Sequence, residues 1–73
     1  MADQPEALRR LRHDLANPLA ALLAETQLLL LNEATLDSAT VTALREIEAI
    51  ARHMRDLLDA SRRSAENPED LKA

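Results

Sequence analysis

Two stripes of apolar residues with a helical period run through this chain of 73 residues. The first stripe advances by steps of three and four and contains Leu8, Leu11, Leu15, Leu19, Leu22, Thr26 and Leu29. The second stripe follows the same steps and contains Leu44, Ile47, Ala51, Met54 and Leu58. Such spacing places the apolar side chains on one face of an α-helix and is typical of helices in bundles and coiled coils. The sequence therefore predicts an all-α fold with two long helices.

A polar segment between the stripes, NEATLDSAT, sets the expected boundaries. We expect a domain over residues 1–65, with a first helix over about 5–32, a turn over 33–38 and a second helix over about 39–64. Asp37 or Ser38 can cap the second helix, because either side chain can accept a hydrogen bond from a free backbone N–H group. Residues 66–73 form a polar tail whose Pro68 keeps the helix from continuing far.

The chain is short for two helices that fold alone. Ordering a residue costs about 1.5 kcal/mol of conformational entropy, and a two-helix hairpin buries only one stripe per helix. The short turn predicts that the helices lie antiparallel. Further apolar residues flank the stripes and indicate more than one neighbour, namely Leu23, Leu28, Leu30, Leu31, Val41, Ile50 and Leu57. We therefore expect an antiparallel helical hairpin that forms a homodimer, a four-helix bundle with a closed core.

The composition excludes several classes of function. The chain has no glycine, so it lacks a phosphate-cradling loop, and we expect no nucleotide cofactor bound to this chain. It has no aromatic residue and a net charge of -4, which argue against a nucleic-acid partner. Two histidines without a cysteine do not favour a metal site. The run Leu28 to Leu31 is too short to cross a membrane, and we expect no membrane contact.

A histidine and a proline stand together in the segment LRHDLANPLAA, Leu11 to Ala21. At 100° per residue, His13 lies about 160° from the stripe through Leu15 and Leu22, so its ring is expected to face solvent. Pro18 cannot donate to the carbonyl of Asp14, and its ring crowds that carbonyl, which predicts a local bend. The bend would lie one turn beyond His13.

The predicted neighbours of His13 suit an anionic partner. Arg9 and Arg10 lie four and three residues before it on the same face, and guanidinium groups bind phosphate oxygens well. Asn17 and two small alanines, Ala16 and Ala20, share the face on the other side and leave room for a docked partner. Asp14 is adjacent in sequence, so a regular helix does not turn it toward the ring.

Simpler interpretations remain open at this point. Exposed histidines on helices are most often ordinary surface residues, and a proline within a helix is often only a tolerated kink. We take the second histidine, His53, as a surface residue, because neither a proline nor an adjacent acid accompanies it. The polar face around it carries two spaced pairs of opposite charge, Glu48 with Arg52 and Arg55 with Asp59.

The string HDLANPL, His13 to Leu19, resembles the H-box of two-component sensor histidine kinases. That box reads histidine, acid, leucine, a variable residue that is often arginine, threonine or asparagine, proline and leucine. Ala16 departs from it where arginine is common. The likeness extends to the long first helix, the short turn and a second helix that ends in LLDASR, and the segment ENPEDLKA resembles the link into the ATP-binding domain of such kinases.

The resemblance implies a dimerisation and histidine phosphotransfer domain. His13 would accept the γ-phosphoryl group of ATP through the lone pair of a neutral imidazole and pass it to an aspartate of a response-regulator receiver domain. Asp14 would be the general base or the acid that orients the ring. Asn17 would orient a water for phosphatase activity, and Pro18 would be the hinge.

The same resemblance places ATP and Mg²⁺ on a separate catalytic domain and the phosphoacceptor in the cytoplasm, whether or not the parent kinase is attached to a membrane. A phosphorelay protein without kinase activity would carry the same histidine. A structural helical-hairpin adaptor, in which the box is coincidental, is the third alternative.

Overall fold

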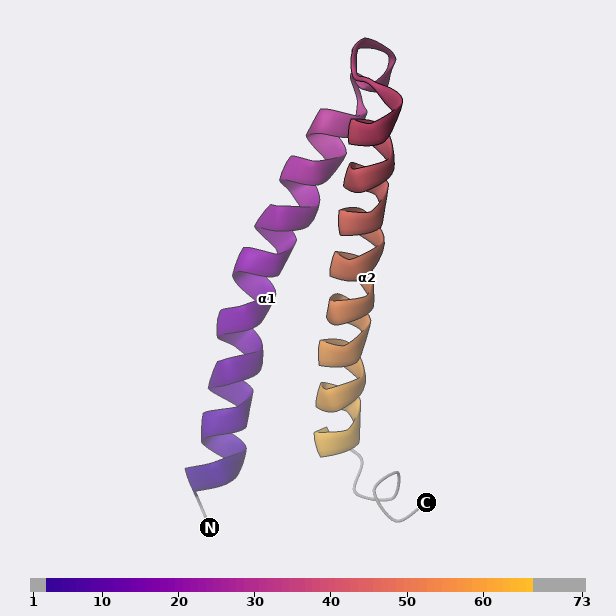
Figure 1. Cartoon of the computed structure of the whole chain (residues 1–73). Coiled ribbons are helices and arrows are strands. Elements are labelled where there is room, and N and C mark those ends of the chain that lie inside the picture. The colour runs from indigo at the N-terminus through magenta and orange to yellow at the C-terminus, as the bar shows by residue number, and fades with distance from the viewer. Residues whose placement is uncertain (1–2, 67–73) are drawn as a thin grey trace.

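The structure, a computed structural model, describes residues 3–66 and is a helical hairpin. The helix α1 covers Asp3–Leu30, a short 3-10 helix η1 covers Glu33–Thr35, and α2 covers Ser38–Glu66. The two long helices run antiparallel from the turn (Figure 1). No β-strand occurs in the described range. The predicted all-α, antiparallel hairpin is therefore confirmed.

The helix boundaries differ slightly from the prediction. The first helix begins at Asp3 rather than near residue 5, and ends at Leu30 rather than near residue 32. It ends early because the chain tightens there. The N–H of Leu31 donates to both Gln27 and Leu28 carbonyls, at 3.1 and 3.3 Å, and the next N–H donates three residues back. At the other end of the chain, residues 67–73, most of the predicted tail, lie outside the described residues.

Polar side chains fix the turn at the start of α2. The carboxylate Oδ1 of Asp37 accepts a hydrogen bond from the backbone N–H of Thr40 at 2.7 Å, which confirms Asp37 as the helix cap. Hydrogen bonds from Thr40, through its side chain and its backbone, hold the pKa of Asp37 below its ordinary value. Arg45 donates to both carboxylate oxygens of Glu33 at 2.8 Å, and so ties η1 to α2. The connection between the helices is thus short and held at both ends.

The core of the single hairpin is small. Leu19 and Leu23 from α1 and Ala51 from α2 are buried, and Leu58 packs against them. Thr26 is also buried, and its hydroxyl donates to the carbonyl of Leu22 at 2.7 Å, which satisfies the polar atom. Ala51 is completely covered, so the helices approach closely at that point. The α1 members of this core, Leu19, Leu23 and Thr26, all lie on the turn side of Pro18.

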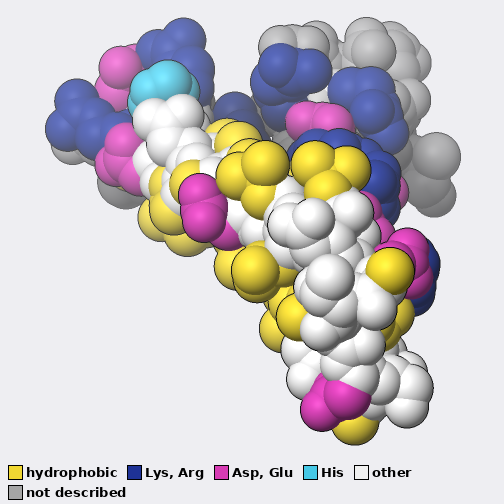
Figure 2. Space-filling view, turned by 90° about the horizontal axis from the view of Figure 1, so that it is seen from above, with side chains coloured by type: hydrophobic (Ala, Val, Ile, Leu, Met, Phe, Trp, Pro, Cys, Tyr) yellow, Lys and Arg dark blue, Asp and Glu magenta, His cyan; other side chains and the backbone are white. Residues whose placement is uncertain are grey.

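Much of each apolar stripe stays exposed in one hairpin. The exposed stripe residues are Leu8, Leu11, Leu15, Leu22 and Leu29 of α1 and Ile47 and Met54 of α2, and the flanking Ile50 and Leu57 of α2 are exposed beside them. Each keeps between 40% and 61% of its surface accessible. One neighbouring helix covers only part of an apolar stripe, so these side chains need a second neighbour to be buried. Figure 2 shows hydrophobic side chains open on the surface between the charged groups.

Helix α1 continues unbroken through Pro18, and Figure 1 shows it curving along its length, so that the helices stand farther apart at the end away from the turn. Two local features favour curvature. Pro18 provides no N–H for the carbonyl of Asp14, and the Thr26 hydroxyl adds a bond to the carbonyl four residues before it. No described helix is both long and apolar enough to cross a membrane.

Candidate functional site

His13 is exposed and lies in the N-terminal half of α1. In Figure 1 this half of the helix stands farther from α2 than the half near the turn. With the buried Leu19 as reference, His13 lies about 120° to one side and the exposed Leu22 about 60° to the other, at 100° per residue. The predicted exposure of the ring is confirmed. The histidine and the exposed leucines of the stripe (Leu8, Leu11, Leu15, Leu22 and Leu29) therefore occupy two different faces of α1, on either side of its contact with α2.

The predicted basic neighbours of His13 are also exposed. Arg9 forms an ion pair with Glu6, which lies one turn earlier on the same face. Arg10 and Asn17 are exposed on either side of the ring along the helix. The pair with Glu6 was not predicted from the sequence. The i, i+3 spacing of an acid and an arginine was the signal that could have revealed it.

Asp14 is exposed and, in the described part of the chain, forms no hydrogen bond with His13. Adjacent side chains on a helix point about 100° apart, so this geometry follows from the regular helix. Within the hairpin alone, no hydrogen bond joins the two side chains.

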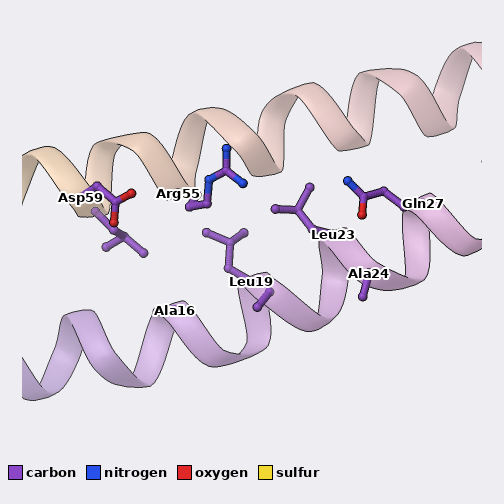
Figure 3. Close-up of a pocket in the computed structure, with 9 residues that line it drawn as sticks. Ala16, Leu19, Leu23, Ala24, Gln27, Arg55 and Asp59 are labelled. Atoms are coloured by element: carbon purple, nitrogen blue, oxygen red, sulfur yellow. The ribbon is translucent and has the colours of Figure 1, made fainter.

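A groove of about 400 Å³ lies between α1 and α2 on the side of α1 that carries His13. Its α1 wall consists of Ala16, Leu19, Ala20, Leu23, Ala24 and Gln27, and its α2 wall of Arg55, Leu58 and Asp59. Figure 3 shows the two walls facing each other, with the small alanines along α1 and the charged groups on α2. The expected room beside Ala16 and Ala20 is thus part of a groove that begins one turn beyond His13.

Polar groups fix the helices at the turn end of this groove. Gln27 Nε2 donates to Glu48 Oε2 at 3.3 Å across the hairpin, and Arg52 donates to the same oxygen at 3.2 Å. Arg52 first and Gln27 second hold the pKa of Glu48 below its ordinary value. The predicted Glu48 pair with Arg52 is confirmed.

The second predicted charge pair was wrong. Arg55 Nε lies 3.7 Å from Asp56 Oδ1 rather than forming an ion pair with Asp59. Both Arg55 and Asp59 line the groove instead. Spacing alone could not show this, because the groove exists only when the two helices are placed side by side.

The second histidine, His53, is exposed on α2. No group of three or more histidine, cysteine, aspartate or glutamate side chains within residues 3–66 could hold a metal ion. The reactive group on the surface beside the groove is therefore the exposed imidazole of His13. Arginines, the amide of Asn17 and small alanine side chains surround it.

The model of one protein family, the His Kinase A (phospho-acceptor) domain, matches residues 4–66. This match covers both long helices and the turn, and includes the whole string from His13 to Leu19. No curated protein and no solved structure matched the chain. The family match covers most of the sequence, and its two-helix region coincides with the hairpin. The chain belongs to the His Kinase A phosphoacceptor domain family of the histidine kinases.

Proposed function

We propose that this chain is the dimeric phosphoacceptor core of a sensor histidine kinase and that His13 is the residue that carries the phosphoryl group. The observation behind the proposal is the exposed imidazole of His13, inside a family match, with Arg9, Arg10 and Asn17 on its face. A phosphoryl donor must reach the ring directly, so exposure is a requirement. His53 is also exposed but lies outside the H-box and has neither basic residue at the corresponding positions.

The first transfer uses ATP, which is the substrate of a separate catalytic domain. A ring nitrogen of neutral His13 attacks the γ-phosphorus, the bond from that phosphorus to the bridging oxygen breaks, and ADP leaves. The other ring nitrogen loses its proton as the product becomes neutral. Asp14 is the proposed acceptor or orienting group for that proton. Because no hydrogen bond joins Asp14 to the ring in the hairpin, this role requires that the docked catalytic domain or a helix movement bring them together.

The second transfer gives the phosphoryl group to an aspartate of a response-regulator receiver domain. A carboxylate oxygen attacks phosphorus, the N–P bond breaks, and the ring nitrogen takes up a proton. The groove beside His13 suits this partner, because its alanines allow another helix to approach closely while Arg55 and Asp59 supply charged contacts. Asn17 is the proposed group that orients water when the receiver is dephosphorylated.

The exposed apolar stripe supports dimerisation. Leaving nine large apolar side chains 40% to 61% accessible is unfavourable in water, and a second copy of the hairpin offers a matching surface. Because this stripe and the His13 face flank the α2 contact on opposite sides, a four-helix bundle would cover the leucines and leave the imidazole accessible. In this arrangement the chain works in the cytoplasm, where ATP and the receiver are found.

A direct labelling experiment tests the proposal. The chain is incubated with radiolabelled ATP, Mg²⁺ and the catalytic domain of a matching kinase, and compared with the variants His13→Gln and His53→Gln. We expect acid-labile, alkali-stable label on the parent chain and on His53→Gln, and none on His13→Gln. Absence of label on the parent chain, with a catalytic domain proven active on its own substrate, would support a structural adaptor instead. Sequencing the gene on both sides of this segment separates a kinase from a phosphorelay protein.

A further inference from the structure

Arg9 lies between an acidic residue and the proposed phosphoacceptor on one face of α1. Its guanidinium pairs with Glu6, three residues earlier. His13 lies four residues later, and residues at this spacing have Cβ atoms about 5–6 Å apart. Helical side chains lean toward the N-terminus, so the imidazole leans over the turn that carries Arg9. Arg9 can therefore reach either Glu6 or a group attached to the ring.

The two possible partners differ in strength. The side chains of Arg9 and Glu6 are 69% and 62% exposed, and an ion pair this open to water contributes little to stability. A phosphoryl group brings close to two negative charges and three acceptor oxygens. A guanidinium group binds such oxygens in a two-pronged, charge-assisted arrangement. Phosphorylation of His13 would therefore draw Arg9 away from Glu6.

We propose that Arg9 is a positioning residue that exchanges partners during the phosphorylation cycle. It is held by Glu6 while the imidazole is free and by the phosphoryl oxygens once His13 is phosphorylated. This inference rests on the proposed function, since it takes His13 as the phosphorylated residue. The exchange keeps the guanidinium off the free ring, which leaves the lone pair open to attack ATP, and then neutralises part of the charge on the product.

Chemical phosphorylation tests the exchange without any kinase. In potassium phosphoramidate, the ring nitrogen attacks phosphorus, the P–N bond of the reagent breaks, and ammonium leaves with the proton that the ring gives up. The reaction is carried out on the His53→Gln chain, so that only His13 is labelled. Phosphorus NMR then follows the phosphoryl resonance against pH and gives the midpoint of its protonation.

Arg9→Gln should raise this midpoint by about 0.3–0.5 pH units, because a nearby guanidinium favours the doubly charged phosphoryl group. Glu6→Gln should lower the midpoint by releasing Arg9. That effect should disappear in the double variant Glu6→Gln with Arg9→Gln, because no arginine is left to be released. Arg45→Gln, which removes the same charge near the turn, should leave the midpoint in place. Helix content by circular dichroism verifies that each variant folds.

Two results would overturn the exchange. One is an unchanged midpoint in Arg9→Gln. The other is a Glu6→Gln substitution that shifts the midpoint equally with and without Arg9, which would indicate that Glu6 acts only by repelling the phosphoryl group. A matched control places the phosphoryl group on His53 in the His13→Gln chain, where none of these variants should move the midpoint. If the phosphoramidate results hold but ATP never labels His13, the proposed function fails while the partner exchange stands.

Discussion

Gln27 of α1 and Glu48 of α2 are joined by a side-chain hydrogen bond of 3.3 Å that crosses the hairpin, and Arg52 shares the same carboxylate oxygen. The bond sets the relative position of the helices near the turn, close to the completely buried Ala51. An ionised carboxylate is the better acceptor for both donors, so this contact depends on the charge of Glu48.

Acid should weaken the hairpin through Glu48. Its pKa is lower in the folded chain than the ordinary value of 4.5, so its stabilising contribution is present above pH 4.5 and is lost as the pH falls through the folded-state pKa. Thermal melts followed by circular dichroism between pH 7 and pH 3 should show this loss. Glu48→Gln should melt lower at pH 7 and show less acid dependence than the parent chain. Equal acid dependence in both chains would contradict the assignment, and Glu46→Gln on an exposed position of α2 serves as the control.

Leu22→Glu should disrupt the proposed dimer. Burying one leucine contributes about 1.5–3 kcal/mol, and each dimer loses two such side chains and gains two charges in their place. We expect association to weaken by more than a hundredfold, as measured by analytical ultracentrifugation. Ala21→Glu places the same charge on a neighbouring exposed position away from the stripe and should leave association unchanged. A parent chain that sediments as a monomer at micromolar concentration would refute the four-helix bundle itself.

Pro18→Ala should stabilise α1. Alanine restores an N–H donor for the carbonyl of Asp14 and removes a steric conflict, a change of up to about 3 kcal/mol in a helix interior. Chemical denaturation measures the gain. If Pro18 is the hinge, the same variant should also alter the ratio of kinase to phosphatase output when paired with a catalytic domain and a receiver. Unchanged stability together with an unchanged ratio would rule out the hinge.

Ala51→Leu should force the helices apart. Ala51 has no accessible surface, and a larger side chain at a packed position typically costs about 1–3 kcal/mol. The melting temperature should fall, and the bond between Gln27 and Glu48 should lengthen or break. Ala49→Leu, at an exposed position on the same helix, is the matched control and should melt like the parent chain. A variant at Ala51 that melts no lower than this control would show that the interface adapts freely.

The sequence alone predicted the helices, the turn, the Asp37 cap and the exposure of His13, because each depends on local spacing. It did not predict that Leu23 would be buried while Leu22 stays exposed. Both leucines belong to the apolar surface of α1, but Leu23 faces α2 and Leu22 faces away from it. Only the position of the second helix distinguishes the two. The groove was missed for the same reason. Its α1 wall ends at Gln27 and its α2 wall begins at Arg55, so the two walls are at least 28 residues apart along the chain.

The local charge pairs were predicted unevenly. Glu48 with Arg52 follows the usual four-residue spacing, and α1 reinforces it through Gln27. Arg55 had an acid at the same spacing but pairs with its direct neighbour, Asp56, in an exposed contact of 3.7 Å. Exposed pairs contribute so little that several arrangements have similar free energies, and sequence spacing alone does not select one of them.

The separation of the leucine face from the His13 face has a consequence for how such a chain can diverge. Under the proposed function, a substitution along the groove wall would change which partner docks beside His13 without touching the leucines. A substitution among the leucines would change which copies associate without touching the groove. After gene duplication, two descendants could therefore lose binding to each other's partners while still forming heterodimers. They could equally stop forming heterodimers while still binding the same partners. Under this proposal, a change in partner specificity and a change in dimer specificity are separate evolutionary steps for such a hairpin.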